Sequence, residues 1–156
     1  MNSELYFFKY SFPCAQVLLD QKRIDNNAYE KLKEMFFSNK APSKRVLEEV
    51  FSSAFRRINI VAKQMNKDAW DLGVIKKYFL EEHNKFIDKG EGEYAYFGED
   101  FKNICKVYIV EVVDKKEDIL SVKYNNTVRK VLGNIVSKAK KGDKVTIHLG
   151  FAIEIL

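Results

Sequence analysis

Residues 142–156 read Gly-Asp-Lys-Val-Thr-Ile-His-Leu-Gly-Phe-Ala-Ile-Glu-Ile-Leu and carry the clearest structural signal in the chain. The Gly-Asp pair predicts a turn, and the residues after it predict a short strand that ends at His148. Gly150 predicts a corner, and the apolar residues of 152–156 predict a last strand. This stretch therefore favours β-structure in the C-terminal third of the sequence.

The preceding residues repeat the strand pattern. Residues 107–113 are rich in β-branched side chains, residues 119–124 alternate in polarity, and an Asn-Asn pair predicts a tight hairpin into residues 127–131. About five short strands within some fifty residues are typical of a small closed barrel. We therefore predict a five-stranded OB-like or SH3-like β-barrel over residues 104–156.

Residues 1–88 have the spacing of helices instead. Apolar residues recur every three to four positions, and Ser11, Asp25 or Asn26, and Ser43 stand at expected helix starts. The predicted fold class is α+β, with an N-terminal all-helical domain over 1–88 followed by the barrel. Four helices are expected, at about 11–22, 26–36, 43–65 and 71–87.

Residues 89–103 form the predicted connection between the two halves. Gly90 and Gly92 stand among charged residues, as is typical of a linker. Tyr94, Tyr96 and Phe97 follow them, and full burial of one such ring is worth roughly 1.5–3 kcal/mol. We therefore predict a packed linker whose three aromatic rings are largely buried.

The composition is that of a folded protein. Apolar residues make up 46% of the 156 positions, and the net charge is +5 with both signs mixed along the chain. Such mixing indicates a solvated surface more than a nucleic-acid-binding stripe. No apolar run has the roughly 20 residues of a membrane span, and the first residues lack the basic region of a signal peptide. We expect a cytoplasmic protein.

A resemblance to a known family rests on the residues around His148. Lys141-Gly142-Asp143, then His148, then Gly150-Phe151-Ala152 match in order and spacing the C-terminal strands of the HypC (HupF) family of hydrogenase-maturation chaperones. The similarity covers residues 104–156, and His148 falls where that family keeps its functional histidine. Members of the family begin with Met-Cys, whereas this chain begins Met1-Asn2.

The resemblance implies a non-enzymatic accessory protein in the maturation of the [NiFe]-hydrogenase metallocentre. In the family, a cysteine thiolate and a nearby histidine hold an iron centre together with a second protein. The expected cofactor is iron, and the expected partner is the hydrogenase large subunit or another maturation protein. The expected binding residues include His148, Gly150 and Phe151, with Gly150 structurally required at its corner.

Cys105 is the expected metal partner of His148. It lies beside the first predicted strand, and a soft thiolate with an imidazole suits iron. His148 is then expected to be within reach of solvent or of a partner. The alternative is that Cys105 is a small buried residue and His148 a hydrogen-bonded strand residue.

Two further side chains are candidates outside the barrel. His83 follows a pair of glutamates on the fourth helix, and a surface or capping role is favoured for it, with a binding role facing the barrel as the alternative. Cys14 follows Pro13 near a helix start, where the helix dipole lowers a thiol pKa, or it is simply a buried helix residue. With no histidine near it in sequence, the buried interpretation of Cys14 is favoured.

Other functions remain open at this stage. An OB-like nucleic-acid-binding protein needs exposed aromatic and basic residues on one barrel face. A third alternative is an enzyme that uses Cys105 or His83, although no Walker loop, HExxH or GxSxG motif is present. The two cysteines lie far apart and form no CxxC pair, so structural zinc is not expected. The candidates for the nucleic-acid face are Tyr108, Tyr124, Lys106, Lys123, Arg129 and Lys130.

Overall fold

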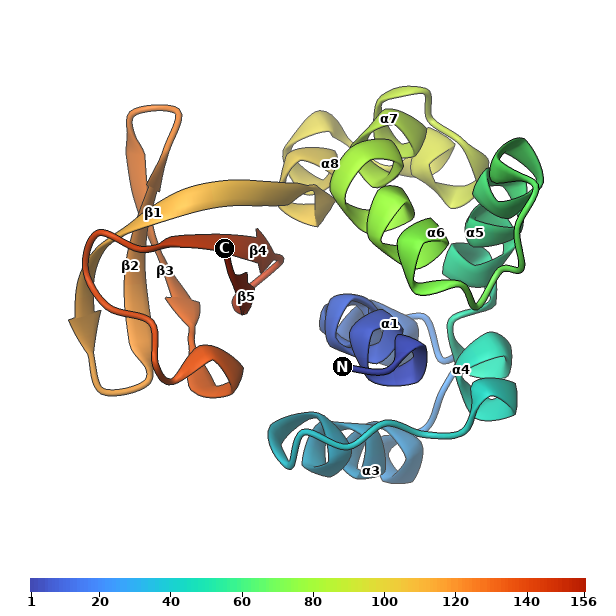
Figure 1. The fold of residues 1–156 in the computed structure, drawn as a ribbon, viewed down its shortest axis with the longest axis horizontal. Helices are drawn as coiled ribbons and strands as arrows, with labels where there is room; N and C mark the ends of the chain where they lie inside the picture. The colour runs from blue at the N-terminus through green and yellow to red at the C-terminus, as the bar shows by residue number, and fades with distance from the viewer.

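The computed structural model describes residues 1–156 and places helices before strands (Figure 1). This order confirms the predicted α+β class. None of the helices has the length and apolar character needed to cross a membrane. The α-helices are α1 (Ser3–Ser11), α2 (Ala15–Asp20), α3 (Asn26–Phe37), α4 (Lys44–Val50), α5 (Ser52–Met65), α6 (Leu72–Lys77), α7 (His83–Asp88) and α8 (Glu99–Cys105).

Side-chain caps set several of the helix starts. Asp25 accepts a hydrogen bond from the backbone N–H of Ala28, and Ser43 accepts one from Val46, so both predicted starts are confirmed. The helix predicted over 43–65 is broken at Phe51, whose backbone leaves the helical region with φ −104° and ψ 44°. The helix predicted over 71–87 is interrupted by the π-helical segment η2 (Tyr78–Glu82).

The five predicted strands are confirmed and pair in the closed order β1-β2-β3-β5-β4. All neighbours are antiparallel except β3 and β5, which pair in parallel through Leu132 and Phe151. The inward faces of the strands bury a core of Val, Ile, Leu and Ala side chains. The strands are β1 (Val107–Lys116), β2 (Ile119–Tyr124), β3 (Thr127–Leu132), β4 (Lys144–His148) and β5 (Phe151–Ile155).

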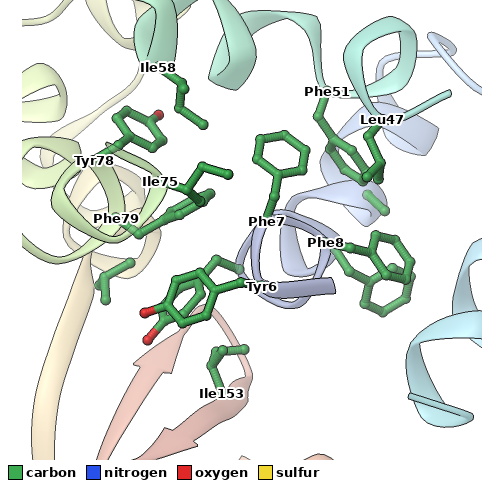
Figure 2. Packing of buried hydrophobic residues seen from close by; sticks show 14 of the residues in the cluster. Tyr6, Phe7, Phe8, Leu47, Phe51, Ile58, Ile75, Tyr78, Phe79 and Ile153 are labelled. Carbon is green, nitrogen blue, oxygen red and sulfur yellow. The ribbon is translucent and has the colours of Figure 1, made fainter. Parts of the chain in front are cut away.

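Helix α1 lies near the middle of the molecule, with β4 and β5 on one side and α4 on the other (Figure 1). Figure 2 shows Phe7 and Phe8 pointing toward the helical part, while Tyr6 lies on the side of α1 that faces Ile153 of β5. The largest cluster of buried apolar residues includes Ile153 and Val107 with residues of the helices. The hydroxyl of Tyr10 also bonds Thr146 of β4 at 2.8 Å. The helical part and the barrel therefore share packing.

The connection between the two parts differs from the prediction. Tyr94 is buried and Phe97 is half-buried, but Tyr96 is 89% exposed. The predicted burial of all three rings is therefore wrong for Tyr96, because the 3₁₀ helix η3 (Gly92–Tyr96) turns its ring outward. Helix α8 then fills the rest of the connection and extends to Cys105.

Candidate functional site

His148 ends strand β4 and lies inside the molecule. Only 1% of its surface is exposed, so the expected direct access from solvent is not found. Its Nδ1 is 2.6 Å from the backbone oxygen of Tyr10 in α1. Because a carbonyl only accepts, Nδ1 carries the proton and donates it, and Nε2 keeps its lone pair. The ring is therefore held in one tautomer, in which the lone pair of Nε2 can accept a hydrogen bond or bind a metal.

The thiol beside this free nitrogen belongs to Cys14. Its Sγ lies 3.8 Å from Nε2 of His148. Cys14 ends the 3₁₀ helix η1 (Phe12–Cys14), and Pro13 is tolerated at the start of that helix because it has no N–H to donate. The raised pKa of the thiol agrees with the favoured interpretation of Cys14 as a buried helix residue and not with a pKa lowered by the helix dipole, but the contact with His148 was not predicted.

Cys105 does not take the predicted place beside His148. It ends helix α8 instead of opening the first strand, and it is buried in a small cluster with Ile87 and Tyr94. Cys14 and Cys105 both line a second small cavity of about 60 Å³, so the two thiols are neighbours across it. The thiol that contacts the histidine is nevertheless that of Cys14.

His83 is buried, so the favoured surface or capping role is wrong, and its ring faces the barrel as the alternative held. Its ring centroid lies 5.0 Å from that of His148, with the planes at 79°. His83 follows the π-helical segment η2, and such segments are frequent at functional sites because the extra residue turns the following side chains. The two imidazoles form an edge-to-face pair between α7 and β4.

Asn84 fixes the orientation of His83. Its side-chain amide donates to the backbone oxygen of Val107 at 2.7 Å and accepts from the N–H of Val107 at 2.9 Å. The same Oδ1 lies 3.2 Å from Nδ1 of His83, which therefore donates to it. His83 thus also holds its proton on Nδ1.

A cavity of about 70 Å³ adjoins these three side chains. Its size corresponds to a ligand of a few heavy atoms or to a few water molecules. Ser11 also lines it, and the buried Oγ of Ser11 has no hydrogen-bond partner. The polar and charged lining residues are Ser11, Cys14, Arg23, Ser52, Ser53, Arg57, Tyr78, His83, Glu93, Tyr94 and His148.

Arg57 supplies a buried charge at the edge of this cavity. Its guanidinium contacts Glu91 at 2.5 Å and Glu93 at 3.1 Å, and it stacks over the ring of Tyr94 at 4.4 Å. Gly92 has φ +58°, and a Cβ there would approach Arg57 Nη2 at 3.2 Å. The glycine thus allows two carboxylates to converge on one arginine.

Burial keeps His148, His83 and Cys14 uncharged. Desolvation lowers the pKa of His148 to about 4 and that of His83 to about 3, the latter with a further contribution from His148. Desolvation also raises the pKa of the Cys14 thiol to about 12, although part of this residue reaches the surface. At neutral pH the site therefore holds two neutral imidazoles and one protonated thiol.

Gly150 and Phe151 are the other two residues that were predicted to bind beside His148. Phe151 packs against Phe36 at 5.3 Å and Phe12 at 5.9 Å between ring centroids. A Cβ at Gly150 would meet no atom within 4 Å, so the expected structural need for glycine there is not found. The left-handed residue of this corner is Leu149, with φ +50°.

Two side chains that could donate to a metal, not three, lie close together. No group of three His, Cys, Asp or Glu side chains surrounds a common point. Cys14 Sγ and His148 Nε2 do converge, and the Nδ1–H of His148 is held by a carbonyl in the manner of metal-binding histidines. The pair fits a metal that brings or recruits its other ligands.

The residues proposed for nucleic-acid binding are partly engaged elsewhere. Tyr108 and Tyr124 stack on one another at 4.8 Å. Lys106 forms an ion pair with Asp88 at 2.6 Å, and Arg129 donates to the backbone oxygen of Leu149. Lys123 and Lys130 are exposed and make no ion pair, so four of the six candidate residues are engaged in contacts within the chain.

Comparison with known proteins adds no relative. No protein-family model matches the chain, and no curated protein matches it.

Proposed function

We propose that this protein is a non-enzymatic accessory protein of metallocentre assembly, related to the HypC family, that holds iron as cargo. The observation that supports this most strongly is the 3.8 Å approach of Cys14 Sγ to His148 Nε2. A thiol and an imidazole are the donor pair that the resemblance implies. Cys14 supplies the sulfur that was expected from Cys105.

The chemistry of the two donors supports iron binding. A neutral imidazole with its proton fixed on Nδ1 is ready to donate from Nε2. The Cys14 thiol must lose its proton to become a ligand, and metal binding drives that loss. Two protein ligands leave further positions for ligands from a partner or from small molecules, as suits a cargo that is passed on.

Ser11 has a role in this proposal. Its unpartnered hydroxyl lines the cavity next to the thiol, where it can donate a hydrogen bond to a ligand of the iron. The partner is the hydrogenase large subunit or another maturation protein, and the place of action is the cytoplasm. Both cysteines are free thiols, which agrees with a reducing compartment.

Anaerobic affinity purification from the native host tests the proposal. The wild-type protein should retain iron and a maturation partner, and Cys14→Ser and His148→Ala should each lose the iron. Cys105→Ser is the matched control, since Cys105 is equally a free thiol but its sulfur forms no hydrogen bond with His148, which approaches only the Cys105 backbone. Each variant is first shown to unfold cooperatively near the wild-type temperature.

Two outcomes would contradict the proposal. One is normal iron retention by folded Cys14→Ser and His148→Ala proteins. The other is loss of iron in Cys105→Ser with full retention in Cys14→Ser, which would return the metal site to the pair predicted from the sequence.

A further inference from the structure

A larger pocket shares no lining residue with the two small cavities described above. Its volume is about 470 Å³, within the roughly 300–1,000 Å³ of small-molecule sites. It opens where α1 and α6 meet the 3₁₀ helix η4 (Asn134–Val136) and β5. This α1–β5 pocket is lined by Met1, Tyr6, Lys9, Leu72, Lys76, Ile135, Val136, Ser137, Lys138, Ile153, Glu154 and Ile155.

Lys9 is the most unusual residue of the α1–β5 pocket. It is only 8% exposed, yet no carboxylate lies within ion-pair distance of its ammonium group and no hydrogen bond engages it. Glu154 is the one acidic residue that lines the pocket, and it accepts a hydrogen bond from Tyr10 at 3.1 Å. Burial lowers the pKa of Lys9, and Glu154 offsets this only in part. The stem of Lys9 is covered while its ammonium keeps contact with solvent and has no partner in the chain, so it can bind a counter-charge from a ligand.

Tyr6 is a second polar side chain at this wall. It is 3% exposed, and its buried hydroxyl forms no hydrogen bond of good geometry, although Tyr10 and Glu154 lie close to it. Buried hydroxyl groups are nearly always paired, so an unpaired one at a pocket wall requires an explanation. The ring itself is covered by Lys76, whose ammonium lies 5.4 Å from the centroid.

The charges of the pocket favour an anion. Lys9, Lys76 and Lys138 bring three ammonium groups, against the single carboxylate of Glu154. The remaining walls are mainly aliphatic, formed by Leu72, Ile153 and their neighbours. A fitting ligand therefore has a negative head and an apolar body.

We propose that the α1–β5 pocket binds a small organic anion, a carboxylate or a phosphate ester on an aliphatic body. The head accepts hydrogen bonds from the Lys9 ammonium and the Tyr6 hydroxyl. The body packs against Leu72 and Ile153, and Lys76 and Lys138 attract the anion at the mouth. The site is separate from the Cys14–His148 pair and does not depend on iron.

Titration calorimetry on the metal-free full chain tests this, with octanoate and octyl phosphate as probes. At least one of the two anions should bind, and octylammonium, which has the same tail and the opposite charge, should not. Inorganic phosphate should bind at least about tenfold more weakly than octyl phosphate, because it has no apolar body. Equal binding of octylammonium, or of inorganic phosphate, would overturn the proposal, as would no binding of either anion.

Two variants locate the site. Lys9→Met and Tyr6→Phe should each weaken anion binding about tenfold, since each removes a hydrogen bond to a charged group. Lys63→Met, on the exposed face of α5, is the matched control and should bind as the wild type does. Unchanged affinity in both pocket variants would overturn the assignment. If either variant fails to fold, methyl NMR of the wild type decides, because bound anion must shift Leu72 and Ile153.

Discussion

The sulfur of Cys14 lies 3.8 Å from Nε2 of His148, although 134 positions separate the two residues in the chain. The contact exists because α1 packs against the barrel, which places Tyr10 on one ring nitrogen of His148 and the following 3₁₀ turn on the other. The helical part thus completes a site whose histidine belongs to the barrel.

Metal uptake should depend on pH through this thiol. Because burial raises the Cys14 pKa to about 12, the thiol is protonated at all ordinary pH values, and each metal bound must release one proton. The affinity for Co²⁺ or Fe²⁺ should rise about tenfold per pH unit between about pH 6 and 8.5. Anaerobic calorimetry in buffers of different ionisation enthalpy measures the released proton. An affinity independent of pH would exclude Cys14 as a ligand.

The two histidines should make the fold sensitive to mild acid. Their folded pKa values, about 3 and about 4, lie below the ordinary 6.5, so the unfolded chain binds protons first. Their contribution to stability is complete above about pH 6.5 and is lost as the pH falls toward 4, by up to ~1.4 kcal/mol per pH unit for each ring. Urea unfolding at a series of pH values measures the slope. His83→Gln should make that slope shallower, and an unchanged slope would argue that His83 is not buried neutral.

Arg57 should be far more important for stability than its neighbour Arg56. Arg57 is 2% exposed, and its loss leaves Glu91 and Glu93 without their buried counter-charge, which costs about 3–5 kcal/mol. Arg56 also contacts Glu91, but its side chain is 49% exposed, so its loss should cost about 1 kcal/mol or less. Urea unfolding of Arg57→Met and Arg56→Met at pH 7 compares them. Equal losses would show that burial does not set the difference.

Substitution of two barrel glycines, Gly133 and Gly150, should lower the stability of the fold by different amounts. A Cβ at Gly133 would lie 2.8 Å from Cγ of Leu120, inside the barrel core, so Gly133→Ala should cost about 1–3 kcal/mol. Gly150→Ala meets open space and should change stability by about 0.5 kcal/mol or less. Thermal unfolding of both variants provides the test. A larger loss at Gly150 would restore the structural role predicted from the sequence.

Local patterns predicted most elements because capping and alternation are local. Asp25 and Ser43 were recognisable caps, and all five strands fell close to their expected residues. Helix α1 was missed because Tyr6, Phe7, Phe8 and Tyr10 are all buried, and a helix enclosed on every side shows no polar face.

The site could be predicted only in part. The sequence placed His148 at the end of a strand, which the structure confirms, but the identity of the thiol beside it depends on tertiary packing. Cys105 was closer in sequence to the first strand. It ends α8, however, and its side chain packs into the small cluster with Tyr94. Arg57, Ser11 and the α1–β5 pocket had no local signal, since each depends on groups that are distant in the chain.

Asn84 links His83 to His148 through hydrogen bonds and strand pairing. Its amide joins Val107 as one more strand residue would, and Val107 in turn pairs with His148 across β1 and β4. One side chain therefore clamps the end of α7 to the edge of the barrel, and the spacing of His83 and His148 is set by that clamp. A partner that pulled β1 away from α7 would spread the two rings and open a path to the sulfur, so that docking and release of a cargo would be parts of one movement.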